Sequence, residues 1–323
     1  MIKCLLLRGC ITSIRRSMVN NIQSPPPLNR GSTIGIIAPS GNIQNLEAFD
    51  AGVRILHEMG FKTAFPRDLW PGYQYLADAD EKRVEEFHVM YNDPEIHAIM
   101  AARGGFGCLR ILDQLDSMNI SSSQKLVIGF SDITLLHYTL QSSCSLMTLH
   151  GPVVTSLPLL TKDCLEQFYA SVTTDLKRWS FSAKVEILRG GENKRGITAG
   201  GNLATIISSI GTKHQQQWKD KIVFLEDTAE PSYRIDRMLT QLKLAGMLDD
   251  AAAFILGDFS NGLEIDNTSS IRQNESVWNR MLELTQDKTS LWADFPIGHG
   301  HINYSIPMGL MVTLDNSSGS LYT

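Results

Sequence analysis

The chain has 323 residues, 43% of them hydrophobic and 20% charged, which suits a globular protein of one or two domains. Its net charge of -5 gives no reason to expect a nucleic-acid partner. No apolar run approaches the roughly 20 residues that cross a bilayer, so we expect no membrane association. The five scattered cysteines form no CxxC pair, which argues against a disulfide framework and a zinc site and favours the reducing cytoplasm.

Residues 1–30 form a basic N-terminal extension. They carry five Lys or Arg residues and no acid, and the first acidic residue is Glu47. Such a start is typical of a mitochondrial transit peptide. The alternative is a disordered extension without function, and the sequence leaves both interpretations open. Pro25–Pro27 then predict a stiff spacer.

Strands and helices are predicted to alternate through residues 31–156. Apolar runs predict strands within residues 33–41, 96–101, 126–128 and 146–154, and helical periodicity predicts helices near 45–59, 81–91, 108–115 and after 132. Alternation of this kind implies a parallel sheet with helices on both faces. We therefore predict an N-terminal α/β domain here, with its site at the carboxyl ends of the strands.

The rest of the chain is predicted to form a second domain after a connection. Residues 157–195 are less regular and are assigned to the connection. Residues 196–323 are predicted to form a smaller C-terminal α/β domain, with strands at 221–227, 252–256 and 308–314, helices ending near 210 and spanning 233–248 and 270–284, and a loop at 298–301.

The stretch Leu126–His137 carries the first chemical signal. Ser131 and Asp132 stand between an apolar strand and a helical pattern. A serine in such a turn can project its hydroxyl beyond the end of a sheet, with the following amide facing the same space. That arrangement suits a nucleophile. On this stretch alone, however, a helix cap by Ser131 or Asp132 is the simpler interpretation.

Glu226 and His299 can complete a serine triad with Ser131. A hydroxyl needs a base to take its proton, and an acid that orients the histidine. Spacing alone supports this weakly, since the chain has eight histidines. His299 lies between two glycines in a loop, where a role in core packing is less natural. Of Glu226 and Asp227, only one can approach His299 from a regular strand, because successive side chains alternate.

The loop Arg103–Gly107 is rich in glycine. Free amides of Gly104 or Gly105, together with that of Asp132, can bind a developing oxyanion. The alternative is a tight turn that simply requires glycine. The chain contains neither G-x-G-x-x-G nor a P-loop, so nucleotide binding is poorly supported.

Two further patterns leave alternatives open. His299-x-His301 resembles part of a metal site, but no third ligand stands at a telling spacing and HExxH is absent, so we predict neither metal nor cofactor. Tyr233, Arg234 and Arg237 are interpreted as helix surface residues. In the alternative, Arg234 or Arg237 holds a substrate carboxylate.

Six segments together resemble the LD-carboxypeptidase family of serine peptidases, which includes murein tetrapeptide carboxypeptidases and microcin C immunity-type enzymes. They occur in the family's order and the resemblance covers about Thr33 to Leu314. The matching segments are Arg103–Gly107, Ile128–Asp132, His150–Pro152, Gly200–Leu203, Leu225–Asp227 with Tyr233–Arg237, and Gly298–Gly300. The chain departs from the family in having Phe106 where members often have Tyr, and Thr228-Ala229 in place of a common Val-Gly.

The resemblance implies a function and a set of site residues. Ser131 would be the nucleophile, His299 the base and Glu226 its orienting acid. From the glycine-rich loop and the serine turn we predict the amides of Gly105 and Asp132 as the oxyanion hole. We also predict Arg103, Gly104, Tyr233 and Arg237 as substrate-binding residues. The resemblance also implies a strand-rich core in the C-terminal domain and a homodimer.

The expected reaction is hydrolysis of the amide between an L-configured centre and a terminal D-amino acid, as in release of D-alanine from a peptidoglycan tetrapeptide. The expected partner is therefore a small peptide or peptidoglycan fragment. One rival is an amidase of the same fold that acts on aminoacyl-nucleotides or other acyl-amides. The other is a non-catalytic binding protein. The G-x-S-x-G elbow of α/β-hydrolases is missing, since residue 133 is Ile.

Overall fold

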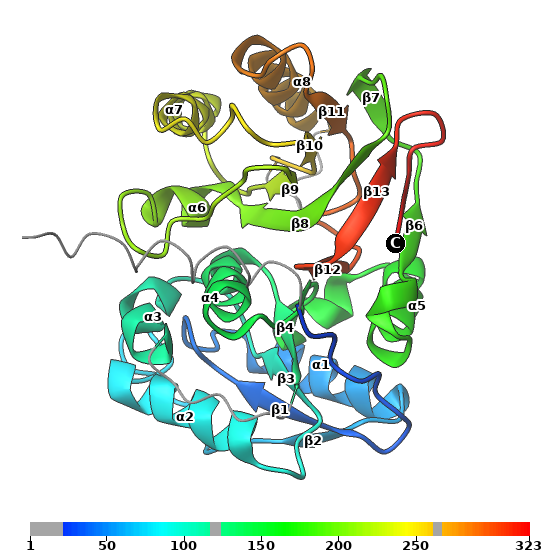
Figure 1. The fold of residues 1–323 in the computed structure, drawn as a ribbon. Helices are drawn as coiled ribbons and strands as arrows, with labels where there is room; N and C mark the ends of the chain where they lie inside the picture. The colour runs from blue at the N-terminus through cyan, green and yellow to red at the C-terminus, as the bar shows by residue number, and fades with distance from the viewer. Residues whose placement is uncertain (1–21, 117–123, 261–266) are drawn as a thin grey trace, which may run out of the picture.

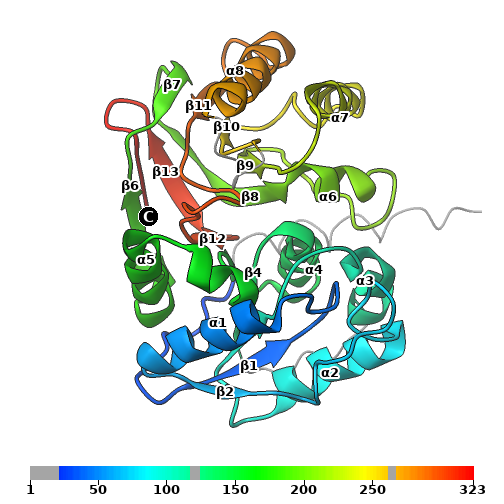
Figure 2. The ribbon, with the colours of Figure 1, turned by 180° about the vertical axis from the view of Figure 1, so that it is seen from behind.

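The computed structural model describes residues 22–116, 124–260 and 267–323. Two sheets, each flanked by helices, lie one above the other in Figure 1, and the same two units are seen from behind in Figure 2. Within the described ranges, no helix is long and apolar enough to cross a membrane. The predicted targeting segment falls mainly on residues 1–21, which lie outside them.

The first sheet is parallel except at one edge. Its order is β12-β5-β4-β3-β1-β2, and only β12 runs antiparallel to its neighbour. Its strands are β1 (Thr33–Ile37), β2 (Lys62–Ala64), β3 (Ala98–Ala101), β4 (Leu126–Gly129), β5 (Thr148–His150) and β12 (Ile306–Met308).

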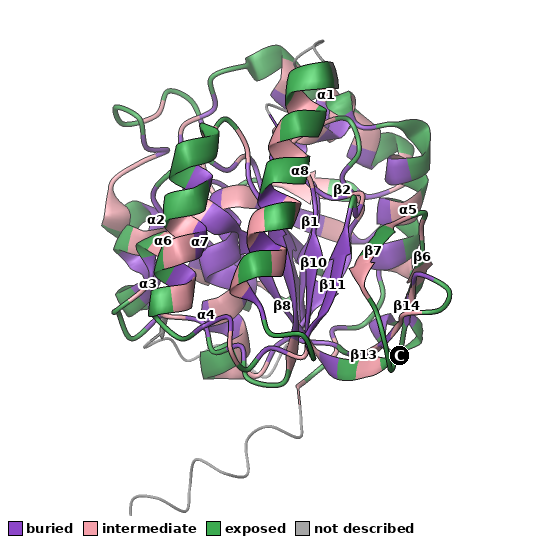
Figure 3. Ribbon diagram, turned by 90° about the horizontal axis from the view of Figure 1, so that it is seen from above, coloured by how far each residue is buried: buried purple, intermediate pink, exposed green. Residues whose placement is uncertain are grey.

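Helices cover both faces of this sheet. They are α1 (Leu46–Glu58), α2 (Asp80–Asn92), α3 (Cys108–Asp116), α4 (Thr134–Cys144) and α5 (Lys162–Thr173). Because strand side chains alternate, Ile36 faces the core shared with α1 and α5, whereas Ile37 faces the core shared with α2, α3 and α4. In Figure 3 central strands such as β1 and β10 are buried, and the outer faces of the helices are exposed.

The second sheet has eight strands in the order β6-β14-β13-β8-β9-β10-β11-β7, of which β8 to β11 run parallel. Its strands are β6 (Ser180–Ser182), β7 (Glu186–Arg189), β8 (Lys194–Asn202), β9 (Lys221–Glu226), β10 (Ala253–Leu256), β11 (Ser290–Ala293), β13 (Met311–Asp315) and β14 (Ser320–Tyr322). Helices α6 (Leu203–Ser208), α7 (Ser232–Leu244) and α8 (Asn267–Leu284) share a core with one face.

The predicted α/β class, with a parallel-sheet unit followed by a second α/β unit, is confirmed. Hydrophobic periodicity did not predict the short strands β6 and β7. The predicted connection contains α5, β6 and β7, and the two strands form the outer edges of the second sheet. Residues 22–30, assigned to the N-terminal extension, pack on the body: Leu28 is 3% exposed and its amide donates to the carbonyl of Val172.

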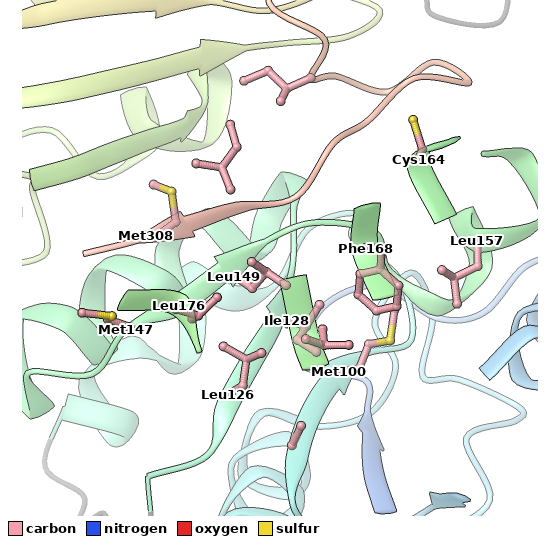
Figure 4. Close-up of a cluster of buried hydrophobic side chains, with 14 of the residues drawn as sticks. Met100, Leu126, Ile128, Met147, Leu149, Leu157, Cys164, Phe168, Leu176 and Met308 are labelled. Carbon is pink, nitrogen blue, oxygen red and sulfur yellow. The ribbon is translucent and has the colours of Figure 1, made fainter. Parts of the chain in front are cut away.

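One hydrophobic core links the two sheets. It joins residues of the first sheet, such as Ile128 in β4 and Leu149 in β5, to Phe224 and Trp292 of the second. Figure 4 shows part of this core, in which Phe168 of α5 lies near Met100 of β3 and Ile128 of β4. Met308 of β12 belongs to the same cluster. The chain also crosses between the sheets, because residues 294–305 leave β11 of the second sheet and enter β12 of the first. These links fix the position of one unit on the other.

We predict that Gly200→Ala destabilises the protein much more than Gly211→Ala. Both glycines have positive φ angles, 107° and 83°. A Cβ on Gly200 would lie 1.9 Å from the carbonyl oxygen of Phe224 in β9, whereas one on Gly211 meets nothing within 4 Å. Gly211→Ala should cost about 1 kcal/mol from backbone strain, and Gly200→Ala at least about 2 kcal/mol more because the strands must separate. Urea unfolding measures both, and equal losses would contradict this account.

Candidate active site

Ser131 has a left-handed backbone conformation at the end of β4. Its φ angle is 63°, a region that residues other than glycine adopt only when the surrounding structure compensates for the strain. Phe130 before it is extended, and Ser131–Ile133 form one turn of 3₁₀ helix that leads into α4. The sharp turn between strand and helix, predicted from sequence, therefore exists.

The loop after β3 lies directly against this serine. A Cβ atom on Gly104 would lie 3.0 Å from Ser131 Oγ, so a larger residue would crowd the hydroxyl. Asp132 connects the serine turn to the neighbouring loops. Its buried carboxylate accepts hydrogen bonds from the Ser40 hydroxyl and, at 2.8 Å, from the amide of Cys108. One carboxylate thus ties the chain after β1 and after β3 to the serine turn.

Ser131 and His299 line the same cavity, which has a volume of about 320 Å³. Its walls are loops that follow β3, β4, β5 and β9, at the edge where functional sites of parallel sheets lie. The lining residues are Arg103, Gly104, Gly105, Phe130, Ser131, Val153, Thr155, Ser156, Leu159, Thr228 and His299. A larger cavity of about 740 Å³ between α7 and α8 has no histidine in its wall.

Glu226, the last residue of β9, is fully buried and contacts the imidazole of His299. Its Oε2 lies 2.8 Å from His299 Nδ1. Burial disfavours the charged form of each group, but their mutual attraction outweighs it, so the pKa of His299 is raised and that of Glu226 is lowered. Because Nδ1 is engaged, Nε2 is the nitrogen left for proton transfer. The Phe130 ring packs against His299, 4.6 Å between centroids.

Asp227 points elsewhere, as the alternation of strand side chains predicts. Its carboxylate accepts hydrogen bonds from the Asn202 side chain at 3.0 Å, from the amide of Ala204 at 2.9 Å and from that of Thr228 at 2.8 Å. Burial and the nearby Glu226 raise its pKa to about 6. Asp227 therefore organises the start of α6, and Glu226 alone of the two bonds to His299.

The predicted oxyanion donors lie beside the serine. Gly105 lines the cavity with a φ angle of 113°. Asp132 is the second residue of the 3₁₀ turn, whose first amides have no acceptor within the helix. Both amides thus belong to the segments that meet at Ser131, and their role as an oxyanion hole stays a prediction.

The predicted substrate-binding residues fall into two groups. Arg103 and Gly104 line the cavity that holds Ser131. Tyr233 is 61% exposed on α7 and lines the cavity between α7 and α8 instead, with the Arg237 guanidinium over its ring at 5.5 Å. Arg234 pairs with Glu230 at 3.3 Å. The single chain therefore gives no geometric support for these three residues as substrate ligands.

Residues 153–159 form a wall of the cavity that was not predicted from the sequence. These residues follow β5 and form a 3₁₀ helix over Val154–Leu159, against which α1 packs at Gly52, where a Cβ atom would lie 2.0 Å from the Val154 carbonyl oxygen. Their position could have indicated this role, because they follow a parallel strand and sites lie at the carboxyl ends of such strands. His150, for which the sequence predicted no role beyond its family motif, is buried behind the site. Burial lowers its pKa to about 4.

The histidine pair of the H-x-H pattern does not converge. His299 bonds to Glu226, whereas His301 Nδ1 lies 2.7 Å from the carbonyl oxygen of Leu159. Across the described ranges, no group of three or more His, Cys, Asp or Glu side chains is arranged to hold a metal ion.

Two family models match the chain. The LD-carboxypeptidase N-terminal domain matches residues 34–151, and the LD-carboxypeptidase C-terminal domain matches residues 195–314. Together they contain every residue of the proposed triad.

Individual relatives extend over nearly the whole chain. A probable murein peptide carboxypeptidase of Bacillus subtilis is 31% identical, covering 91% of this chain and 92% of the relative. The murein tetrapeptide carboxypeptidase of Pseudomonas aeruginosa is 30% identical, covering 88% and 93%. The microcin C7 self-immunity protein MccF of Escherichia coli is 27% identical, covering 91% and 94%. Among solved structures, muramoyltetrapeptide carboxypeptidase from Oxalobacter formigenes superimposes with a TM-score of 0.76 at 25% identity, covering 90% and 97%.

We predict that Glu226→Gln lowers the pKa of His299, because the substitution removes the negative charge that faces Nδ1. NMR titration of labelled histidines measures this, with His299→Gln identifying the signal. Asp227→Asn is the matched control, since it removes an adjacent charge that does not contact the ring, and it should lower the pKa less. A larger fall in the Asp227 variant would show that the acid is wrongly assigned.

Proposed function

The chain belongs to the LD-carboxypeptidase family of serine-type hydrolases, and from that premise we propose that it releases a terminal D-amino acid from peptidoglycan tetrapeptides. Ser131 is the nucleophile, His299 the general base and Glu226 the acid that orients it. The observation that carries the proposal is the 2.8 Å contact between buried Glu226 and His299, at a cavity that Ser131 also lines.

The reaction begins when Ser131 Oγ attacks the carbonyl carbon of the scissile amide. His299 Nε2 accepts the serine proton, and buried Glu226 stabilises the imidazolium that results. The negative charge that develops on the carbonyl oxygen is bound by the amides of Gly105 and Asp132. Preorganised amides are effective here because they need no rearrangement as the charge appears.

The tetrahedral intermediate then collapses. His299 gives its proton to the leaving nitrogen, the C–N bond breaks, and the terminal D-amino acid departs with a free amine. The rest of the peptide remains as an ester on Ser131. Water then attacks this ester with His299 as base, and the shortened peptide leaves with a new carboxylate.

The rivals remain distinguishable. An amidase for aminoacyl-nucleotides or other acyl-amides would use the same triad, so a panel of L,D- and L,L-tetrapeptides and acyl-amides, read by mass analysis, separates the two. A non-catalytic binding protein would leave Ser131 unlabelled by a fluorophosphonate. The homodimer that the resemblance implies is also part of the proposal, and light scattering of the purified chain tests it.

We expect Ser131→Ala to reduce turnover by on the order of 10³-fold or more, because the triad members act as a unit. Folding should be unaffected, since the substitution removes only one hydroxyl beside an open cavity. Ser142→Ala, which changes a serine on α4 outside the cavity, is the matched control and should keep full activity. Normal turnover by the Ser131→Ala protein would end the serine-hydrolase mechanism.

Treatment with EDTA should leave hydrolysis unchanged. Nucleophile, base and oxyanion donors are all supplied by the chain in the proposed mechanism, so no step needs a metal ion. The rate is compared before and after dialysis against EDTA, and again after zinc is added. Loss on chelation with recovery on zinc addition would favour the H-x-H metal alternative.

A further inference from the structure

Arg103 is a partly buried cation in the wall of the cavity that contains Ser131. It comes two residues after β3, on the loop that presses Gly104 against the serine. Of the described residues that line the cavity, Arg103 and His299 are basic and none is acidic. The cavity is therefore suited to a ligand with negative charge.

The guanidinium of Arg103 is held in place but is not neutralised. Its Nη1 donates to the carbonyl oxygen of Asn42 at 2.7 Å. Asn42 is itself fixed, because its side chain donates to the Gln74 carbonyl at 2.7 Å and its amide to that of Tyr75 at 3.1 Å. Three other arginines of the first unit do pair with acids: Arg67 with Glu86, and Arg83 and Arg110 with Asp80.

Among the described residues, Arg103 forms no ion pair. A partly buried cation without a counter-charge is unfavourable unless an anion completes the site. A guanidinium with free N–H groups binds a carboxylate through two parallel hydrogen bonds.

The position of Arg103 matches the geometry of the leaving residue. In a terminal amino acid, only the nitrogen and the Cα atom separate the scissile carbonyl carbon from the free carboxylate. A carboxylate anchor must therefore share a cavity with the nucleophile. Ideal Cβ positions on Gly41 and Gly105 lie 3.7 Å from Arg103 Cζ and 3.8 Å from its Nη2, so the guanidinium lies beside the glycine loop that contacts Ser131.

We propose that Arg103 binds the C-terminal carboxylate of the residue that is released, and so makes the enzyme a carboxypeptidase rather than an endopeptidase. The proposal deepens the proposed function and rests on it. It assigns a specific ligand to Arg103, which the sequence analysis named only as a substrate-binding residue, and it replaces Arg234 and Arg237 as the carboxylate ligands considered from sequence.

The test measures binding, so it does not depend on turnover. Ser131→Ala protein is titrated calorimetrically with a tetrapeptide that ends in D-alanine and with the same peptide as its C-terminal amide. We expect the free acid to bind roughly 10- to 100-fold more tightly, as a charge-assisted pair predicts. Adding Arg103→Gln should reduce the ratio of acid affinity to amide affinity to about 1. The affinity for the amide should stay within about 3-fold, which would show that the cavity is intact.

Two further variants sharpen the test. Arg103→Lys keeps the charge but loses the planar guanidinium. Its ratio of acid to amide affinity should therefore lie between that of the protein with Arg103 and that of the Arg103→Gln variant. Arg110→Gln is the matched control, because this exposed arginine after the same loop pairs with Asp80 and lies outside the cavity wall, and it should keep the full ratio.

The outcomes separate this inference from the proposed function. A ratio that survives Arg103→Gln, or equal binding of acid and amide by the Ser131→Ala protein, would overturn the role of Arg103. If the wild-type enzyme hydrolyses neither peptide while the ratio still collapses in the Gln variant, the proposed function fails and the carboxylate site stands.

Discussion

The hydrogen bond between Glu226 and His299 is the interaction on which the site depends. An exposed pair of this kind contributes at most about 1 kcal/mol, because water and salt screen it. Here the acid is fully buried, so removing its partner would leave a charge that costs several kcal/mol, about 3–5 in comparable buried pairs. The contact therefore fixes both the orientation of the imidazole and the nitrogen that faces the cavity. Asp227, held by Asn202 and two amides, keeps the end of β9 in register for it.

A second constraint is that Ser131 and Glu226 come from different sheets. Ser131 follows β4 of the first sheet, whereas Glu226 ends β9 of the second. At their boundary the amide of Asn202 donates to Thr134 Oγ1 at 3.1 Å. A Cβ on Gly201 would lie 2.5 Å from the same oxygen. Close approach of backbone to the start of α4 thus sets the spacing of the two halves. His299 belongs to the segment that crosses from one sheet to the other.

The cavity has a consistent electrostatic character. Backbone amides, a guanidinium and an imidazole line it, and its acids, Glu226 and Asp132, are buried behind the wall. Each buried acid holds part of the site in place: Glu226 orients the imidazole of His299, and Asp132 joins the loops that approach Ser131. The negative charges of an oxyanion and of a peptide terminus are both compatible with such a surface.

The sequence by itself determined the α/β class, most long helices, and the turn at Ser131, because these follow from hydrophobic periodicity and from residues next to one another. It also determined that no more than one of Glu226 and Asp227 could face His299, since side chains alternate along a strand. Only the tertiary structure decided that β12 joins the first sheet and that short strands β6 and β7 form the edges of the second, because three or four residues carry too little periodicity to be recognised. It alone also placed Tyr233, predicted from sequence to bind substrate, in a cavity other than that of Ser131. Which side chains share a cavity depends on how loops from separate strands pack, and no local pattern in the chain encodes that distance.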